Sequence, residues 1–237
     1  MEKVHYVTYA THDQGMFREL VNNPHGVEIK VLGWGEKWKG FGDKLIGVLE
    51  HIKTLPPDDY VVFLDGFDTR VLKPPDDIIQ RFDSYGSPKI LVSKSEHAAP
   101  TAYFTRKLFG ACGEWMANAG MWMGRVGDAV EFIDMCKKHL AESGDDDQRA
   151  MNTVCRNYPQ LKVVIDHRCV VFQNKGSGNC ESSAIFCSRP GTGGGGVKGY
   201  IERRIIRGVR EYAPFFKTEI FCLFVAIAVI YYVYKLQ

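Results

Sequence analysis

Two aspartates follow an apolar segment in the first third of the chain. The segment Y-V-V-F-L-D-G-F-D-T, residues 60–69, predicts a strand over 60–64 that runs directly into Asp65 and Asp68. Ligands of open α/β sheets bind at the carboxyl ends of strands, where two carboxylates are costly unless a positive group lies between them. Their oxygens suit Mn²⁺ or Mg²⁺ held together with substrate phosphates. The alternatives are a turn whose aspartates cap their neighbours and an aspartyl-nucleophile phosphohydrolase, which the D-x-x-D spacing disfavours because that class uses D-x-D.

A second acidic cluster, Asp145, Asp146 and Asp147, stands before Gln148 in S-G-D-D-D-Q-R-A-M-N. The segment that follows has helical periodicity, so at least one of the three aspartates is expected to cap a helix. Three in a row exceed what capping needs. If they face the same cleft as Asp65, they would position a sugar hydroxyl or a leaving group.

The segment V-L-G-W-G-E-K-W-K-G-F-G-D-K-L, residues 31–45, is dense in tryptophan, glycine and lysine and follows a predicted strand. Aromatic faces stack on bases and sugars, and lysines and backbone amides bind phosphate. Trp34 and Trp38 could instead be core aromatics. Their glycine and lysine neighbours favour a nucleotide-binding loop.

Short apolar runs alternate with helix-like segments over the first 185 residues, which predicts a three-layer α/β domain with a mostly parallel sheet. Strands are predicted over residues 4–10, 28–32, 60–64, 89–93, 121–124, 163–165 and 170–172. Helices are predicted over residues 15–22, 41–54, 76–82, 125–142 and 146–157.

The end of the chain has a different character, because residues 220–234 carry no charge. Fifteen residues at about 1.5 Å each span about 22 Å, less than the ~30 Å of a bilayer core, which leaves a buried helix as the alternative. Snorkelling of Lys217 and Glu219 and tyrosines at the far interface would lengthen the span. We therefore predict a single transmembrane tail anchor over residues 214–235.

Two further segments lead into this tail. Residues 188–199, S-R-P-G-T-G-G-G-G-V-K-G, are glycine-rich and predict a linker or a loop over an anion, without the order of a P-loop. Residues 200–213 predict a basic amphipathic helix. Beside a membrane, its arginines would place the N-terminal domain on the cytosolic side.

Composition narrows the class of protein. The chain has 237 residues, 45% of them hydrophobic, with 30 basic and 28 acidic side chains and a net charge of +2. Disorder is excluded, and no global charge attracts nucleic acid. The seven cysteines form no C-x-x-C pair, so neither a zinc finger nor a full disulfide framework is favoured, and most of them are expected to be small core residues in a reducing compartment. No apolar signal peptide opens the chain, which also favours a cytosol-facing domain.

Several motifs together resemble the glycosyltransferase domain of the procollagen lysyl hydroxylase/glycosyltransferase (PLOD-like) family and are similar to collagen galactosyltransferases. In order, over about residues 4–187, they are W-G-E-K-W-K-G, G-D-K-L, F-L-D-G-F-D-T, N-A-G-M-W-M-G, G-D-D-D-Q and I-D-H-R-C-V-V-F-Q-N. The resemblance implies a GT-A fold, Rossmann-like, that binds a UDP-sugar and Mn²⁺. Some large DNA viruses carry members of this family. A cytosol-facing domain would suit glycosylation carried out in the cytoplasm, as in such viruses.

The resemblance also implies roles for residues that match the family motifs. Those on the donor side are the metal-binding Asp65 and Asp68, the uridine-contacting Trp38, the helix-start Lys44, and Asn118 and Gly120 in the sugar-side wall. The acidic triplet, Asp145 to Asp147, and Gln148 are the implied catalytic cluster. Asp166 and Gln173 also match, at positions with an expected structural role.

One departure concerns the metal. Where the family has H-G-N-G-P, whose histidine is a third metal ligand, this chain has I-F-C-S-R-P-G, with Cys187 or Ser188 at that place. Cysteine is a soft ligand poorly matched to Mn²⁺. The alternatives are a water at this position, a histidine from elsewhere (His97 or His167), or a metal-sparing role for Arg189 and Lys198 at the diphosphate.

We therefore expect a glycosyltransferase domain over residues 1–187, a linker over 188–199, a juxtamembrane helix over 200–213 and the anchor over 214–235. The expected activity is metal-dependent transfer of a hexose, glucose or galactose, from a UDP-sugar to a hydroxyl of a protein or glycan acceptor. The alternative is a catalytically silent module that binds a UDP-sugar or glycan at a membrane. Nucleic acid is not an expected partner.

Overall fold

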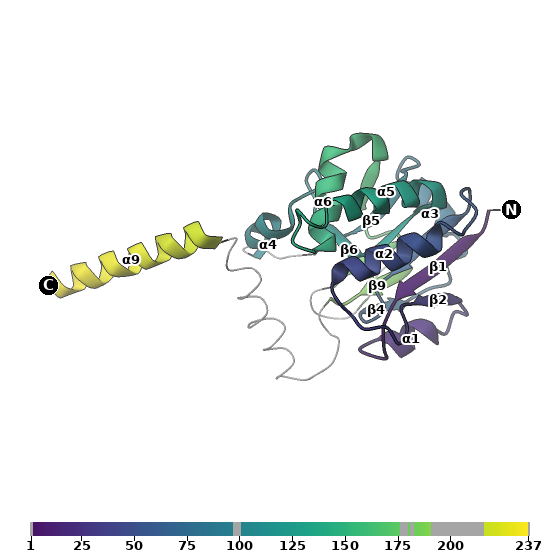
Figure 1. Cartoon of the computed structure of the whole chain (residues 1–237), viewed down its shortest axis with the longest axis horizontal. Coiled ribbons are helices and arrows are strands. Elements are labelled where there is room, and N and C mark those ends of the chain that lie inside the picture. The colour runs from purple at the N-terminus through teal and green to yellow at the C-terminus, as the bar shows by residue number, and fades with distance from the viewer. Residues whose placement is uncertain (1, 97–100, 176–179, 181–182, 191–215, 237) are drawn as a thin grey trace. The chain divides into compact units, whose positions relative to one another are not determined.

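The computed structural model describes residues 2–96, 101–175, 180, 183–190 and 216–236. The chain divides into two compact units, Met1–Gly193 and Gly194–Gln237. Figure 1 shows the elements of both.

A six-stranded sheet forms the centre of the first unit, in the order β2-β1-β3-β6-β5-β7. Its strands are β2 (Ile29–Leu32), β1 (Val4–Tyr9), β3 (Tyr60–Leu64), β6 (Ala117–Arg125), β5 (Ile90–Lys94) and β7 (Val163–Asp166). Strand β1 pairs in parallel with β2 and β3, and β5 pairs in parallel with β7, whereas β6 is antiparallel to both of its neighbours. The prediction of a mostly parallel sheet is confirmed. The carboxyl ends of β3 and β5 and the amino end of β6 therefore share one edge.

Both faces of this sheet are covered, as the fully buried residues of β3 require. One apolar core joins Val61 and Phe63 to helices α2 (Phe41–Ile52), α5 (Val126–Lys138) and α6 (Asp147–Asn157). A second core joins Val62 and Leu64 to the shorter helices α1 (Phe17–Val21) and α3 (Ile78–Asp83). Side chains alternate across a strand, so successive residues of β3 enter opposite cores. The three-layer α/β prediction is confirmed.

Several elements were not predicted. A second sheet has the order β4-β9-β8 and contains β4 (Thr69–Val71), β9 (Phe186–Ser188) and β8 (Phe172–Asn174). Only β8 overlaps a predicted strand, since the strand predicted over residues 170–172 ends at the residue where β8 begins. Helix α4 (Thr101–Phe109) and the short 3₁₀ helix η1 (Pro159–Leu161) lie in segments where we predicted no element. Three-residue strands are too short to show a period of two, so pattern alone does not reveal them.

Four cysteines form disulfides, Cys112–Cys155 and Cys180–Cys187. The prediction that most cysteines are small core residues is wrong for these four, although Cys136 is buried and free. The partners of the first bond are 43 residues apart, and their pairing depends on the tertiary fold rather than on spacing. The cysteines no longer support a reducing compartment, and the cytosolic setting stays a prediction.

The second unit contains helix α9 (Lys217–Leu236) in its described part. Within the described residues, no helix is both long enough and apolar enough to cross a membrane, which corrects the transmembrane prediction over 214–235. The charge-free run covers fifteen residues, and Lys217 and Glu219 occupy the first turn of the helix. The predicted helix over 200–213 and most of the linker over 188–199 lie outside the described residues.

Candidate active site

The turn that carries Asp65 and Asp68 connects the two sheets. Asp65 follows β3, and its backbone N–H donates to the carbonyl of Gly120 on β6 at 2.7 Å. Its Oδ1 accepts the N–H of Phe67 at 3.2 Å, which closes a tight turn. Asp68 directly precedes β4, and its carbonyl accepts the N–H of Arg189 at 2.8 Å. The two predicted metal ligands thus lie on one ordered turn at the carboxyl end of β3.

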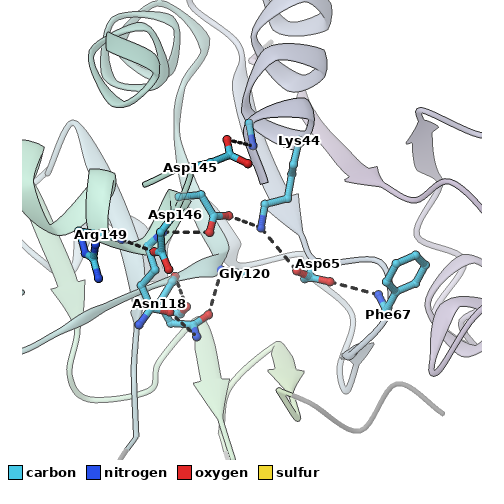
Figure 2. Close-up of polar contacts among 12 residues, drawn as sticks. Lys44, Asp65, Phe67, Asn118, Gly120, Asp145, Asp146 and Arg149 are labelled. Atoms are coloured by element: carbon cyan, nitrogen blue, oxygen red, sulfur yellow. Dashed lines mark hydrogen bonds and ion pairs between the residues drawn. The ribbon is translucent and has the colours of Figure 1, made fainter. Parts of the chain in front are cut away.

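Lys44 supplies the positive charge beside this turn. It lies in the first turn of α2 and is buried, with 7% of its surface exposed. Its Nζ forms an ion pair with Asp147 and lies 3.6 Å from Oδ2 of Asp65 (Figure 2). Burial alone would lower the pKa of Lys44, but the charges of Asp147 and Asp65 outweigh it and hold the pKa above its ordinary value.

Asp147 ties this ion pair to helix α6. It is the first residue of α6 and only 5% exposed, and its Oδ1 accepts the N–H of Gln148 at 2.9 Å. One ammonium therefore faces carboxylates from two other parts of the chain, the turn after β3 and the start of α6. We expect this arrangement to attract a further anion only when Lys44 moves toward it.

Asp146 caps helix α6. Its Oδ1 accepts the N–H of Arg149 at 2.8 Å, as an N-cap aspartate does. Burial and the neighbouring charge of Asp147 raise its pKa from 3.8 to about 6. The capping prediction for this cluster is confirmed at Asp146.

The raised pKa gives the domain a measurable pH dependence. Because the folded state binds the Asp146 proton more tightly than the unfolded chain, the free energy of unfolding falls as the pH rises from about 4 to 6. Asp146→Asn keeps the capping oxygen and removes the charge, so we expect it to stabilise the domain by roughly 1–3 kcal/mol at neutral pH. Urea denaturation at pH 4 and pH 7 measures this. An equal effect at both pH values contradicts the assignment.

Asp145 contacts the start of α2 rather than α6. Its φ is 59°, and its Oδ1 accepts the N–H of Gly42 at 3.1 Å. A Cβ at Gly40 would collide with Oδ2 of Asp145, and one at Gly42 would lie 2.7 Å from Oδ1. The two glycines therefore make room for this carboxylate, which satisfies one of the free amides at the N-terminus of the helix that carries Lys44.

Gly40→Ala is expected to displace Asp145 from α2 and lower the free energy of unfolding by about 1–2 kcal/mol, as loss of a helix cap does. Gly127→Ala is the matched control, because a Cβ there meets nothing closer than 3.5 Å within helix α5. It should be neutral or slightly stabilising. In an Asp145→Asn,Gly40→Ala double variant the cost should differ from the sum of the single costs; strict additivity would rule out the contact.

Asn118 and Gly120 lie on β6 beside Asp65. The amide of Asn118 donates to Oε1 of Gln148 at 3.3 Å, and its Oδ1 accepts the N–H of Gly120 at 2.9 Å (Figure 2). A Cβ at Gly120 would lie 2.8 Å from that same Oδ1. The strand therefore brings the predicted sugar-side residues next to both Asp65 and α6.

The predicted nucleotide loop presents two exposed tryptophans. Trp38 is 42% exposed and packs against Tyr9 and Phe41, with ring centroids 6.2 and 5.8 Å away. Trp34 is 56% exposed and stacks on Phe17 at 5.0 Å. Both lie in the segment between the carboxyl end of β2 and α2. The alternative that they are core residues is wrong.

Two matched residues, Asp166 and Gln173, do not join this group. Asp166 is fully buried and accepts hydrogen bonds from Tyr85 and from three backbone amides, those of residues 170, 171 and 172. Gln173 is buried in β8. For Asp166, these bonds give a structural role, because they fold the chain between β7 and β8.

The position of the third metal ligand holds no free thiol, since Cys187 is bonded to Cys180. Ser188 beside it is 1% exposed, and His167 stacks on Trp115. Across the described part of the chain, no three histidine, cysteine or acidic side chains are grouped so as to hold a metal ion. His97 and Lys198 lie outside the described residues.

Sequence reasoning missed two contacts. It took Lys44 from a motif and did not find its partner Asp147, because a contact between α2 and α6 depends on the fold. It also missed that Asp145 contacts the start of α2. The pair Gly40 and Gly42 is the sequence signal for that contact. Two glycines flanking the first helical residue leave room for a side chain from another segment of the chain.

A model of the PLOD GT domain family matches residues 1–185. The chain belongs to the PLOD GT family. This PLOD GT domain is 24% identical over 160 residues to R699, a protein of Acanthamoeba polyphaga mimivirus, a match that covers 63% of this chain and 34% of that protein. Among solved structures it is similar to a glycosyltransferase involved in the glycosylation of the major capsid of PBCV-1. That likeness has a TM-score of 0.52 and 14% identity and covers 80% of this chain and 93% of the other.

The structural likeness supports the fold of the PLOD GT domain, an α/β domain with a mixed, mostly parallel sheet consistent with GT-A. The family match makes it a glycosyltransferase domain. The chain spans about a third of the mimivirus protein. The resemblance seen in the motifs is therefore confirmed at the level of the family.

Proposed function

We propose that this PLOD GT domain transfers a hexose, glucose or galactose, from a UDP-sugar to a hydroxyl of a protein or glycan acceptor, with Mn²⁺ or Mg²⁺ at Asp65 and Asp68. The observation that carries the proposal is the turn that holds Asp65 and Asp68 at the carboxyl edge of the sheet, with Nζ of buried Lys44 3.6 Å from Oδ2 of Asp65. An exposed Trp38 lies in the loop that leads into the helix of Lys44. Diphosphate chemistry needs positive charge at such an edge, and a base needs an aromatic face.

The donor set fits a hard divalent cation in kind. Asp65 is 28% exposed at its side chain, and it offers Oδ2 on the side of Lys44. With Cys187 in a disulfide, the described residues supply the two carboxylates and no group of three side-chain ligands. Mg²⁺ and Mn²⁺ are commonly bound by one or two carboxylates together with substrate phosphates. A bound cation of this kind would neutralise the charge that develops on the UDP leaving group.

The remaining side chains bind and orient the donor. Trp38 would stack on uracil, and Lys44 would shift its ammonium from Asp65 toward the diphosphate while keeping Asp147. Asn118 and Gln148, already hydrogen-bonded to each other, would hold hydroxyls of the donor sugar beside Asp65. Asp147 would then position Lys44 rather than remove a proton, because it is buried against that ammonium.

A UDP-release assay on the full chain tests the proposal. It would use UDP-glucose and UDP-galactose with Mn²⁺, Mg²⁺ or EDTA. Release from one donor that EDTA abolishes supports a metal-dependent transferase. If neither donor is turned over while UDP still raises the melting temperature, the chain is the catalytically silent binding module instead, and the disulfide at Cys187 is the feature that favours that outcome.

A further inference from the structure

Trp115 forms a rigid aromatic platform apart from the nucleotide loop. Its indole is 41% exposed and lies parallel to the imidazole of His167, with ring centroids 5.7 Å apart and 6° between the planes. Lys94 places its Nζ 5.0 Å from the indole centroid. The backbone of Trp115 pairs with that of Cys112, which is bonded to Cys155 of α6. An exposed ring held from so many sides contributes contact area at little cost in conformational entropy.

This platform lies at the same edge of the sheet as the candidate active site. Lys94 ends β5, and His167 directly follows β7. Trp115 comes three residues before Asn118, whose carbonyl accepts the hydroxyl of Ser93 at 3.1 Å. Parallel strands β5 and β7 end at the edge where β3 ends, so the platform and Asp65 share it.

The strand order places the two aromatic groups on opposite sides of Asp65. The loop of Trp38 follows β2, at one end of the order β2-β1-β3-β6-β5-β7, whereas Trp115 stands beside β5 and β7, at the other end. A transferase needs a donor site and an acceptor site on either side of the reacting carbon. With the nucleotide at Trp38, the platform stands on the acceptor side.

Polar groups of both kinds surround this platform. The ammonium of Lys94 can donate hydrogen bonds. The backbone carbonyl of Lys94 accepts a hydrogen bond from Nδ2 of Asn174 at 2.8 Å. Oδ1 of Asn174 is buried without a hydrogen-bond partner among the described residues. An unsatisfied buried acceptor is costly, and a hydroxyl that reaches it would satisfy it. A sugar ring fits this set, since it offers an apolar C–H face for an indole and hydroxyls that both donate and accept.

We propose that Trp115, supported by Lys94 and His167, binds a saccharide acceptor. That the bound saccharide is the acceptor rests on the proposed glycosyl transfer. Binding of a saccharide at Trp115 does not depend on that proposal. A peptide acceptor without a sugar would match the indole less well, because an extended backbone brings no flat C–H face to it.

Fluorine NMR of the full chain labelled with fluorotryptophan tests the site. The four tryptophans give four signals, assigned with single Trp→Phe variants. Methyl β-galactoside or methyl β-glucoside should shift the Trp115 signal in a saturable way, and UDP should shift that of Trp38. Trp122, 1% exposed in the core, is the internal reference. The proposal is overturned if neither glycoside shifts the Trp115 signal, or if N-acetylserine amide shifts it and the glycosides do not.

Saturation-transfer NMR on variants provides the second measurement. Transfer to the bound glycoside should fall about tenfold in Trp115→Ala, since loss of an aromatic contact weakens binding by about that factor. Trp115→Phe should retain most of it; equal transfer in all three proteins contradicts the site. If Trp115 binds a glycoside while neither UDP-sugar is turned over, the proposed transferase fails and this site stands. If a donor is turned over while the glycosides leave the Trp115 signal unchanged, the proposed transferase stands and the saccharide site at Trp115 fails.

Discussion

Replacing Lys44 with methionine is expected to lower the free energy of unfolding by about 3–5 kcal/mol, the usual cost of leaving one buried charge without its partner. The ion pair of Lys44 and Asp147 is buried at both ends, with 7% and 5% of each residue exposed. Methionine fills the volume of the lysine stem but leaves the carboxylate of Asp147 unpaired. Because the pKa of Lys44 is raised in the folded state, this stabilisation is fully present at neutral pH and is lost only above the ordinary lysine range.

Lys89→Met is the matched control for this prediction. Lys89 also contacts two carboxylates, Asp128 at 3.2 Å and Glu131 at 3.4 Å, but 37% of its side chain is exposed. Its replacement should cost less than about 1 kcal/mol, because water screens such pairs. In Lys44→Met,Asp147→Leu most of the loss should return, since neither charge of this buried pair is then left without its partner. Urea denaturation at neutral pH measures all three variants, and equal losses for Lys44 and Lys89 would show that burial plays no part.

The fold was predictable where hydrophobic periodicity is strong. The strand predicted over residues 60–64 is β3 with the same bounds, and the helix predicted over 41–54 begins at Phe41 as α2 does. Both elements are long or apolar enough for the core to select one face. The direction of β6 could not be predicted in this way, because an apolar strand has the same pattern in either direction.

The second sheet and the disulfides depend on contacts between distant segments. Strand β4 pairs with β9 across more than a hundred residues, and each has only three residues. Its effect on the site is direct, since Asp68 precedes β4 and is held by the amide of Arg189 after β9. Local patterns carry no information about such a pairing.

The residues of the candidate site could be predicted from the sequence, but their contacts could not, because those contacts also join distant segments. Asp65, Asp68 and Trp38 were predicted from residue type and spacing, and the structure places the two aspartates in the turn after β3 and Trp38 in the loop between β2 and α2. The three neighbouring aspartates, Asp145 to Asp147, share one pattern, yet one contacts α2, one caps α6 and one pairs with Lys44. The three aspartates make different contacts because α2 packs on α6.

Asp65 and Asp147 both face Lys44, but they differ in burial and therefore in what their loss should do. Asp147 is 8% exposed at its side chain, and Asp65 is 28% exposed. Asparagine at position 65 still accepts the N–H of Phe67, and Lys44 keeps its closer partner. Asp65→Asn should therefore leave the free energy of unfolding within about 1 kcal/mol of its original value.

The same substitution, combined with Asp68→Asn, is expected to reduce the rate of transfer from the UDP-sugar about a thousandfold or more. Neutral amides cannot hold a divalent cation against the diphosphate, so excess Mn²⁺ should not restore the rate. Asp134→Asn, which removes a partly exposed aspartate paired with Lys138, is the control and should keep full activity. Activity is followed by UDP release, and folding by urea denaturation. Loss of activity without loss of stability separates the role of Asp65 from that of Lys44, whereas a double variant that still transfers sugar would place the metal, or the chemistry, elsewhere.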